Sequence, residues 1–148
     1  MIFFFDANFP GPLARAVQLI TEPKKKQYSV FIHDDWFPAG TPDVEWLNDL
    51  ARRPDPKPIV VGGDGAILRR PAEAAALRES GLSYFLLVKG FPELTLYEQA
   101  SKFFHAWPVI LDLATKLRVP TVFEISVNGK VEKRFATSEV NARSSQKR

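Results

Sequence analysis

The sequence has no cysteine among its 148 residues and only two histidines, His33 and His105. The lack of cysteine excludes disulfide bonds, thiolate catalysis, and the zinc and iron–sulfur sites that use cysteine ligands. Two histidines are too few for a histidine-rich zinc site, and we expect both to pack in the core or lie at the surface. Any metal held by this chain must therefore use oxygen ligands, which favours Mg²⁺ or Mn²⁺.

Long apolar runs are also missing. The apolar start of the chain reaches an acidic residue at Asp6, whereas a secretory signal has a basic start and a longer apolar segment. No apolar run approaches the ~18 residues that a membrane span needs. We therefore expect a cytoplasmic protein with no membrane contact.

Short apolar runs alternate with segments of helical periodicity along the chain. Expected strands lie at 2–5, 28–32, 58–61 and 84–88, and expected helices at 12–22, 43–53, 71–80 and 95–117. Strands that are apolar throughout are typical of a parallel sheet covered on both faces. Asn128-Gly129, between strand-like runs at 121–127 and 131–135, indicates a two-residue hairpin. The pattern predicts a three-layer α/β/α fold with a mainly parallel central sheet and a C-terminal β-hairpin.

The chain has the length of one typical domain. We expect residues 1–135 to form that single α/β domain. From residue 136 onward the sequence is polar and weakly patterned, so we expect 136–148 to be a flexible tail.

Acidic residues follow several of the expected strands. Asp6 follows the first strand, Asp34 and Asp35 follow the second, and Asp64 follows the third. Ligands bind beyond the carboxyl ends of the strands in such a sheet, so these side chains are expected at one edge. Converging carboxylates repel one another unless a cation neutralises them. The pattern favours a divalent-metal site, with helix capping as the alternative role for each acid.

Asp43 and Glu45 open the helix after the second strand, from which they can lean over the same edge. The helix dipole favours acids in a first turn without any metal, so both interpretations stay open for this pair. Phe103, Phe104 and Trp107 have helical spacing, which indicates core packing or a partner-binding face rather than a cofactor pocket.

Three segments, FFFDANFP, PDVEWL and IVVGGDGAI, together resemble the PIN-domain nucleases. The likeness is to the compact PIN-like group that includes the VapC-type toxins of bacterial toxin–antitoxin pairs. In that group an apolar strand ends in Asp-x-Asn-hydrophobic-Pro, which Asp6 and Asn8 match. An Asp-x-Glu motif then opens a helix, matched by Asp43 and Glu45, and a later strand ends near an acid, matched by Asp64. These motifs lie within residues 1–90.

The resemblance implies a Mg²⁺- or Mn²⁺-dependent ribonuclease that hydrolyses RNA phosphodiester bonds. More narrowly, it implies the toxin of a type II toxin–antitoxin system, with a cognate antitoxin and a second copy of the chain as possible partners. It assigns the metal to Asp6, Asp43 and Asp64, and gives Glu45 a supporting catalytic role. Asp35 is a further candidate for orienting ligands or waters.

For the substrate, the resemblance implies that Asn8 fixes a ligand or contacts RNA. Lys89, Arg69 and Arg70 are candidates for phosphate contacts, with an ordinary surface role as the alternative. A bound metal would polarise the phosphate and lower the pKa of the attacking water.

The chain departs from the family pattern in two places. Relatives usually carry Thr or Ser shortly before the third acid, where this chain has Gly62 and Gly63. Lys89 stands where many PIN nucleases have a further acid. These departures leave open a second function, a PIN-like interaction module with weak or no nuclease activity that binds partners through the long helix and the hairpin.

Two other enzyme classes share shorter features with the chain. NAD kinases and lipid kinases carry a Gly-Gly-Asp-Gly element like that in VVGGDGAIL, but they follow it with Thr where Ala66 stands here. Haloacid-dehalogenase phosphatases begin with a strand and Asp-x-Asp, and Asn8 replaces the second acid, which is their general acid. Both classes fit less of the sequence than the PIN-like nucleases do.

Overall fold

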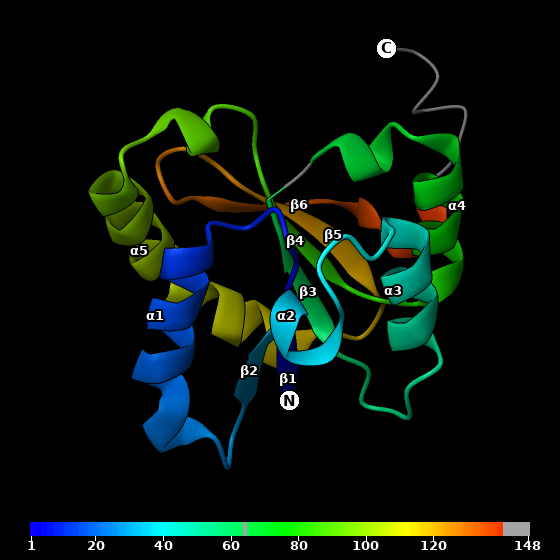
Figure 1. Ribbon diagram of the computed structural model, residues 1–148, viewed down its shortest axis with the longest axis horizontal. Coiled ribbons are helices and arrows are strands. Elements are labelled where there is room, and N and C mark those ends of the chain that lie inside the picture. Colours follow the sequence, from blue (N-terminus) through cyan, green and yellow to red (C-terminus); the bar gives the residue numbers. More distant parts are fainter. Residues whose placement is uncertain (64, 141–148) are drawn as a thin grey trace.

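The computed structural model describes residues 1–63 and 65–140. It contains one six-stranded sheet in the order β2-β1-β3-β4-β5-β6 (Figure 1). The strands are β1 (Ile2–Phe5), β2 (Ser29–Ile32), β3 (Ile59–Gly62), β4 (Tyr84–Leu87), β5 (Thr121–Ile125) and β6 (Val131–Ala136). The first five strands run parallel, and β6 pairs antiparallel with β5. The expected α/β fold with a C-terminal hairpin is confirmed.

Helices cover both faces of the sheet. They are α1 (Gly11–Thr21), α2 (His33–Trp36), α3 (Asp43–Ala51), α4 (Pro71–Ser80) and α5 (Leu96–Lys116), with 3₁₀ turns η1 (Glu22–Lys24), η2 (Gly65–Leu68), η3 (Phe91–Glu93) and η4 (Thr137–Glu139). Figure 1 shows α1 and α5 on one side of the sheet and α3 and α4 on the other. The sequence pattern did not predict α2, because one turn is too short to show a helical period.

The side chains of β1 divide the core into two parts. Phe3 and Phe5 pack toward α1 and α5, while Phe4 packs toward α3 and α4, as expected for the alternation of a strand. Phe103 and Trp107 of α5 are buried in the first of these clusters. Burying one such side chain stabilises the fold by about 1.5–3 kcal/mol. These two aromatic residues therefore pack in the core and are not available to a partner.

The two histidines lie in the kinds of position that the sequence predicted. His33 is buried and its ring packs near those of Phe4 and Phe37. His105 is exposed on α5.

The segment after β6 packs on the fold as far as residue 140. Thr137 is fully buried, and its hydroxyl donates a hydrogen bond to the carbonyl of Leu82 at 2.7 Å. Val140 is buried in the second core cluster. This described part differs from the tail expected from residue 136, because one hydrogen bond and one buried apolar side chain in a polar segment give no periodic signal. Residues 141–148 lie outside the described residues.

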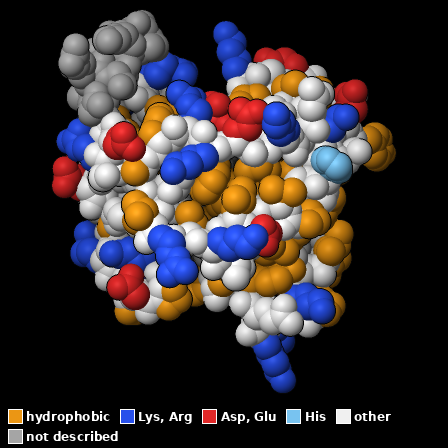
Figure 2. All heavy atoms as spheres, turned by 180° about the vertical axis from the view of Figure 1, so that it is seen from behind, with side chains coloured by type: hydrophobic (Ala, Val, Ile, Leu, Met, Phe, Trp, Pro, Cys, Tyr) orange, Lys and Arg blue, Asp and Glu red, His pale blue; other side chains and the backbone are white. Residues whose placement is uncertain are grey.

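Figure 2 shows the face of the molecule opposite that of Figure 1, with hydrophobic side chains gathered near its middle and Lys and Arg side chains around them. Large hydrophobic residues with high exposure among the described residues are Leu19, Ile20, Leu96, Tyr97, Val109 and Val119. They are divided among α1, α5 and the loop that follows α5. No helix in the described ranges has both the length and the apolar character for crossing a membrane.

Candidate metal-binding edge of the sheet

Asp6 lies directly after β1, at the carboxyl edge of the sheet, with 4% of its surface exposed. Its Oδ1 accepts hydrogen bonds from the backbone N–H groups of Asn8 at 3.0 Å, Phe9 at 3.1 Å and Gly63 at 3.2 Å. Its Oδ2 accepts a hydrogen bond from the Tyr84 hydroxyl at 2.6 Å. Because β3 lies next to β1 and β4 next to β3, the sheet itself brings Gly63 and Tyr84 to this carboxylate. Asp6 is thus held in one orientation by groups from β4 and from the segments that follow β1 and β3.

Burial dominates the electrostatics of Asp6. Loss of contact with water raises the pKa of its carboxyl from 3.8 to about 6, against the lowering effect of the hydrogen bonds from Tyr84, Gly63 and Asn8. The negative charge of Asp43 raises this pKa further, so the two acids lie close enough to interact. A buried carboxylate beside a second acid carries charge that the surrounding donors do not neutralise. A divalent cation is a ligand that would neutralise it.

Two glycines make room for this arrangement. A Cβ added to Gly62 would overlap the Tyr84 hydroxyl and Oδ2 of Asp6, and one added to Gly63 would overlap the backbone of Asn8. The glycines that stand where relatives usually have Thr or Ser therefore have a packing cause in this chain: Gly62 permits the hydrogen bond between Tyr84 and Asp6, and Gly63 permits the close approach of the Asn8 backbone.

Asp43 is the first residue of α3 and is half-buried. Its Oδ1 accepts a hydrogen bond from Nε1 of Trp46 at 3.0 Å, and its Oδ2 lies 3.9 Å from Nη1 of Arg70. The same Nη1 lies 3.5 Å from Oε2 of Glu73 in α4. Asp43, Arg70 and Glu73 line a pocket of about 490 Å³ together with Asn8. Arg70 thus partly balances the charge of two acids beside the Asp6 site.

The structure does not bring Glu45 into this pocket. Glu45 is exposed in the first turn of α3 and is not among the residues that line the pocket with Asp43. The two residues are two positions apart, so their side chains leave the helix about 200° apart. Two acids separated in this way on one helix do not face the same point.

Asp35 has a structural environment rather than that of a metal ligand. Its carboxylate accepts hydrogen bonds from the Ile32 N–H at 2.9 Å, from Gln18 at 2.9 Å and from Arg15 at 3.0 Å. Burial acts to raise the pKa of Asp35, but these hydrogen bonds outweigh it and hold the pKa below its usual value. The neighbouring Asp34 side chain is 70% exposed. Helix capping, the alternative weighed from the sequence, is what the contacts of Asp35 show.

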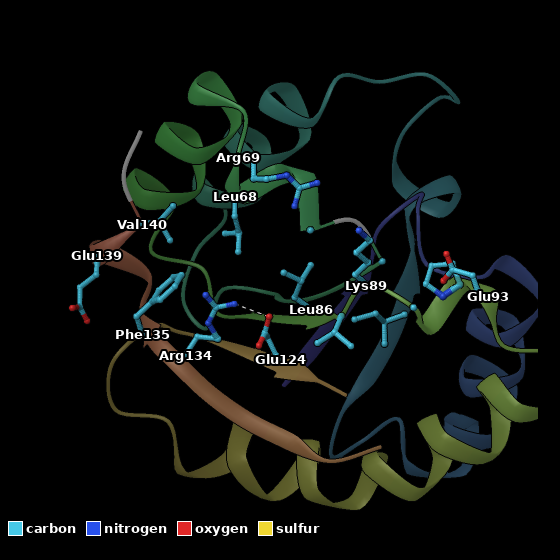
Figure 3. Close-up of a pocket in the computed structure, with 16 residues that line it drawn as sticks. Leu68, Arg69, Leu86, Lys89, Glu93, Glu124, Arg134, Phe135, Glu139 and Val140 are labelled. Carbon is cyan, nitrogen blue, oxygen red and sulfur yellow. Dashed lines mark hydrogen bonds and ion pairs between the residues drawn. The ribbon is translucent and has the colours of Figure 1, made fainter. Parts of the chain in front are cut away.

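Asp64 lies outside the described residues. Its neighbours Gly63 and Gly65 line a second cavity, of about 1000 Å³, at the carboxyl end of β4 (Figure 3). Arg69 and Lys89 are exposed and line the same cavity. Among residues 1–63 and 65–140, no three acidic or histidine side chains come close enough together to hold a metal ion. The metal set of Asp6, Asp43 and Asp64 therefore stays a prediction.

The oxygen atoms at this edge fit Mg²⁺ or Mn²⁺, both of which prefer carboxylates. Oδ2 of Asp6 accepts the Tyr84 hydroxyl and has a second lone pair on the same atom. Asp43 meets the charge of Arg70 at a long distance, 3.9 Å, and its side chain is 22% exposed. These are the oxygen atoms with which the two carboxylates would hold such a cation.

Sequence reasoning missed Tyr84 and Glu73. A tyrosine in an otherwise apolar strand does carry a signal, because a buried hydroxyl needs a hydrogen-bond partner. Its partner is 78 residues away in the chain, and no local pattern identifies it. Glu73 lies in an alanine-rich helix with no motif around it, so only the packing of α4 against α3 places it.

Tyr84→Phe is expected to raise the pKa of Asp6 above about 6, because the hydroxyl that lowers this pKa is lost. The variant should also be less stable at pH 7.5, since a buried hydrogen bond to a charged group contributes about 1.5–3 kcal/mol. An NMR titration of the Asp6 side-chain carbon in metal-free protein measures the shift. Tyr97→Phe is the control, because Tyr97 is 87% exposed. An unchanged titration of Asp6 in Tyr84→Phe would contradict the assigned hydrogen bond.

The sequence matches the family model of the PIN-like domain over residues 1–89. No curated protein and no solved structure matches the chain. The matched residues run from β1 through β4 and contain Asp6, Asp43, Gly62 and Gly63. They also contain Tyr84, so the four hydrogen-bond donors described above for the Asp6 carboxylate lie inside the match. The chain belongs to the PIN-like domain family.

Proposed function

We propose that this protein is a ribonuclease that hydrolyses RNA phosphodiester bonds with Mg²⁺ or Mn²⁺. Membership of the PIN-like family supports a nuclease fold. The fold alone does not determine the reaction, so the assignment to a ribonuclease is based on the residues of the site. The observation that carries the proposal is the buried carboxylate of Asp6, fixed at the sheet edge with its pKa raised to about 6 and with Asp43 beside it.

The residues at this edge have distinct roles in the proposal. Asp6, Asp43 and Asp64 hold the metal, which polarises the phosphate and activates water when it is bound. Tyr84 and the backbone N–H of Gly63 keep the Asp6 carboxylate in place. That fixed orientation means that little reorganisation is needed when the ion and the phosphate arrive.

Substrate contacts are assigned to the surface around these acids. Asn8 lies on the pocket of Asp43, while Arg69 and Lys89 lie on the larger cavity beside Gly63. Cations that flank a metal site are suited to hold the phosphates on either side of the scissile bond.

Substitution of Asp43 tests the proposal. Asp43→Asn is expected to reduce Mn²⁺-dependent cleavage of a structured RNA by about a hundredfold or more, because the metal contributes several kcal/mol to the transition state. Asp49→Asn is the matched control, since Asp49 lies on the same helix and pairs with Arg53 at 3.0 Å. Thermal unfolding of both variants checks that they fold. Cleavage that persists in EDTA, or that is equal in Asp43→Asn and the wild type, would contradict a metal-dependent ribonuclease with Asp43 in its site.

In the cell, we propose that the nuclease acts as the toxin of a type II toxin–antitoxin system and is neutralised by an antitoxin. The motifs around Asp6 and Asp43, which resemble those of VapC-type toxins, support this narrower role. Expression should then arrest growth, and a neighbouring gene should relieve the arrest. A chain that neither cleaves RNA nor binds Mn²⁺ at millimolar concentration would instead favour the interaction-module function, with a partner protein or a second copy of the chain as its ligand.

A further inference from the structure

The cavity of about 1000 Å³ begins at the proposed reaction centre. Gly63, which lines it, also donates its N–H to Oδ1 of Asp6. One wall is formed by Arg134 and Phe135 of β6, a strand that lies beyond the residues matched by the family model. Figure 3 shows Arg69 approaching the cavity from the side opposite β6 and Lys89 from the turn after β4. Residues from four separate segments therefore meet around one space next to Asp6.

An ion pair between Arg134 of β6 and Glu124 of β5 lines the cavity. Nη1 of Arg134 donates to Oε2 of Glu124 at 2.6 Å, as marked in Figure 3. The guanidinium carbon also lies 5.3 Å from the centre of the Phe135 ring. The two charged side chains are 43% and 30% exposed, so a molecule in the cavity can reach them. Arginine has five N–H donors, and a carboxylate oxygen has two lone pairs, so both groups keep hydrogen-bonding capacity for a ligand.

The chemistry of the walls suits a nucleobase. Leu68 and Phe135 give the cavity apolar surface, and the buried Leu86 lies at its base. Apolar and aromatic surfaces stack on the faces of unpaired bases, while fixed polar groups read their edges. Arg69 and Lys89 make no ion pair within residues 1–63 and 65–140, so both are available to the phosphates of the same strand.

Guanine matches the Glu124–Arg134 pair best among the four bases. Its edge carries two neighbouring donors, N1–H and N2–H, followed by two acceptors, O6 and N7. A carboxylate accepts from the two donors, and the arginine fork donates to the two acceptors. The other bases lack this run of two donors beside two acceptors, so they engage only part of the pair.

We propose, on the basis of the ribonuclease function above, that this cavity binds one unpaired guanine of the RNA strand next to the scissile phosphate. Glu124 and Arg134 are the residues that select the base. The carboxyl edge of β1 and β3 carries out the chemistry, and the C-terminal hairpin determines where along the RNA it takes place.

Binding in EDTA tests the inference separately from cleavage. Fluorescence anisotropy compares a labelled single-stranded adenosine oligomer with the same oligomer carrying one central guanosine. The guanosine oligomer should bind the wild type about tenfold more tightly. Glu124→Gln should remove that preference. Glu132→Gln should keep it, since Glu132 pairs with Lys130 on the same hairpin at 3.2 Å but does not line the cavity.

A second variant tests the same inference if Glu124→Gln fails to fold. Arg134→Lys keeps the charge but lacks the planar fork, so it should lose the guanosine preference while retaining affinity for the adenosine oligomer. Equal binding of the two oligomers by the wild type would overturn the inference, as would a preference that survives both substitutions. RNA cleavage without guanosine preference overturns the base site alone. Guanosine-selective binding by a protein that never cleaves RNA overturns the nuclease function alone.

Discussion

Asp6→Asn is expected to give a protein that unfolds at a higher temperature than the wild type at pH 7.5 and that no longer cleaves RNA. The pKa of Asp6 is raised from 3.8 to about 6 in the folded protein, so folding favours the protonated carboxyl. The stability that this preference contributes is fully present below pH 3.8 and is lost as the pH rises through about 6. At pH 7.5 the ionised carboxylate therefore costs on the order of 3 kcal/mol.

An asparagine at position 6 removes that cost. Its amide oxygen can accept the N–H groups of Asn8, Phe9 and Gly63 that now reach Oδ1. Its Nδ2 can donate to the Tyr84 oxygen in place of the present hydrogen bond from that hydroxyl, and the side chain carries no charge to desolvate. Thermal unfolding in EDTA should show the gain at pH 7.5 and little difference at pH 4. Mn²⁺ should stabilise the wild type by binding the native state and should leave the variant unchanged.

The control for this prediction is Asp49→Asn, because Asp49 is 39% exposed and pairs with Arg53, so this variant should gain no stability at pH 7.5. RNA cleavage by Asp6→Asn should fall by about a thousandfold, since several kcal/mol of metal-based stabilisation is lost. A variant that is less stable than the wild type at pH 7.5, or that retains cleavage, would contradict the role given to this carboxylate.

Gly62→Ala is expected to be among the most damaging single substitutions in the chain. The added methyl group would overlap the Tyr84 hydroxyl and Oδ2 of Asp6. These two groups are buried and joined by a hydrogen bond. Overpacking of this kind costs about 1–3 kcal/mol, and the loss of the hydrogen bond to a charged group adds about 1.5–3 kcal/mol. Urea unfolding measures the sum, and the same variant should lose Mn²⁺-dependent cleavage.

Gly65→Ala provides the matched comparison three residues later. The nearest heavy atom to a Cβ at Gly65 is Nη1 of Arg69, at the ordinary contact distance of 3.7 Å. This variant should unfold within about 0.5 kcal/mol of the wild type, as is usual for surface substitutions. If Gly62→Ala is tolerated as well as Gly65→Ala, the close contact around Asp6 is not a constraint on the fold.

Strong local signals explain why the architecture could be predicted from the sequence. The apolar run that ends at Asp6 predicted the first strand, and Asn128-Gly129 predicted the hairpin. Gly129 takes a positive φ of +80°, but Ile125 pairs with Val131, so the loop is longer than the predicted two residues. The order of strands and helices then selects a parallel sheet with its ligand edge at the strand ends. Asp6 and Asp43 were placed at that edge for the same reason.

The finer structure of the site depended on contacts that no local pattern encodes. The hydrogen bond between Tyr84 and Asp6 connects β4 with the end of β1. These two strands lie on either side of β3 but are far apart in the sequence. Glu73 approaches Asp43 through Arg70 because α4 packs beside α3. Glu45 matched a motif by spacing, yet helix geometry turns it away from Asp43. Motif spacing identifies which residue types are present, whereas side-chain direction follows from the fold.

The place of β6 at the end of the sheet has a consequence for engineering. β6 pairs with β5 alone, through a turn at residues 126–130, so exchanging it disturbs one ladder of hydrogen bonds and leaves the ladders between the parallel strands in place. New β6 strands that differ at position 134 can therefore be grafted without changing the carboxyl edge of β1 and β3, while position 124 of β5 is varied by single substitution. A library of such grafts would present different side chains to the cavity, while the strands that hold Asp6 stay the same.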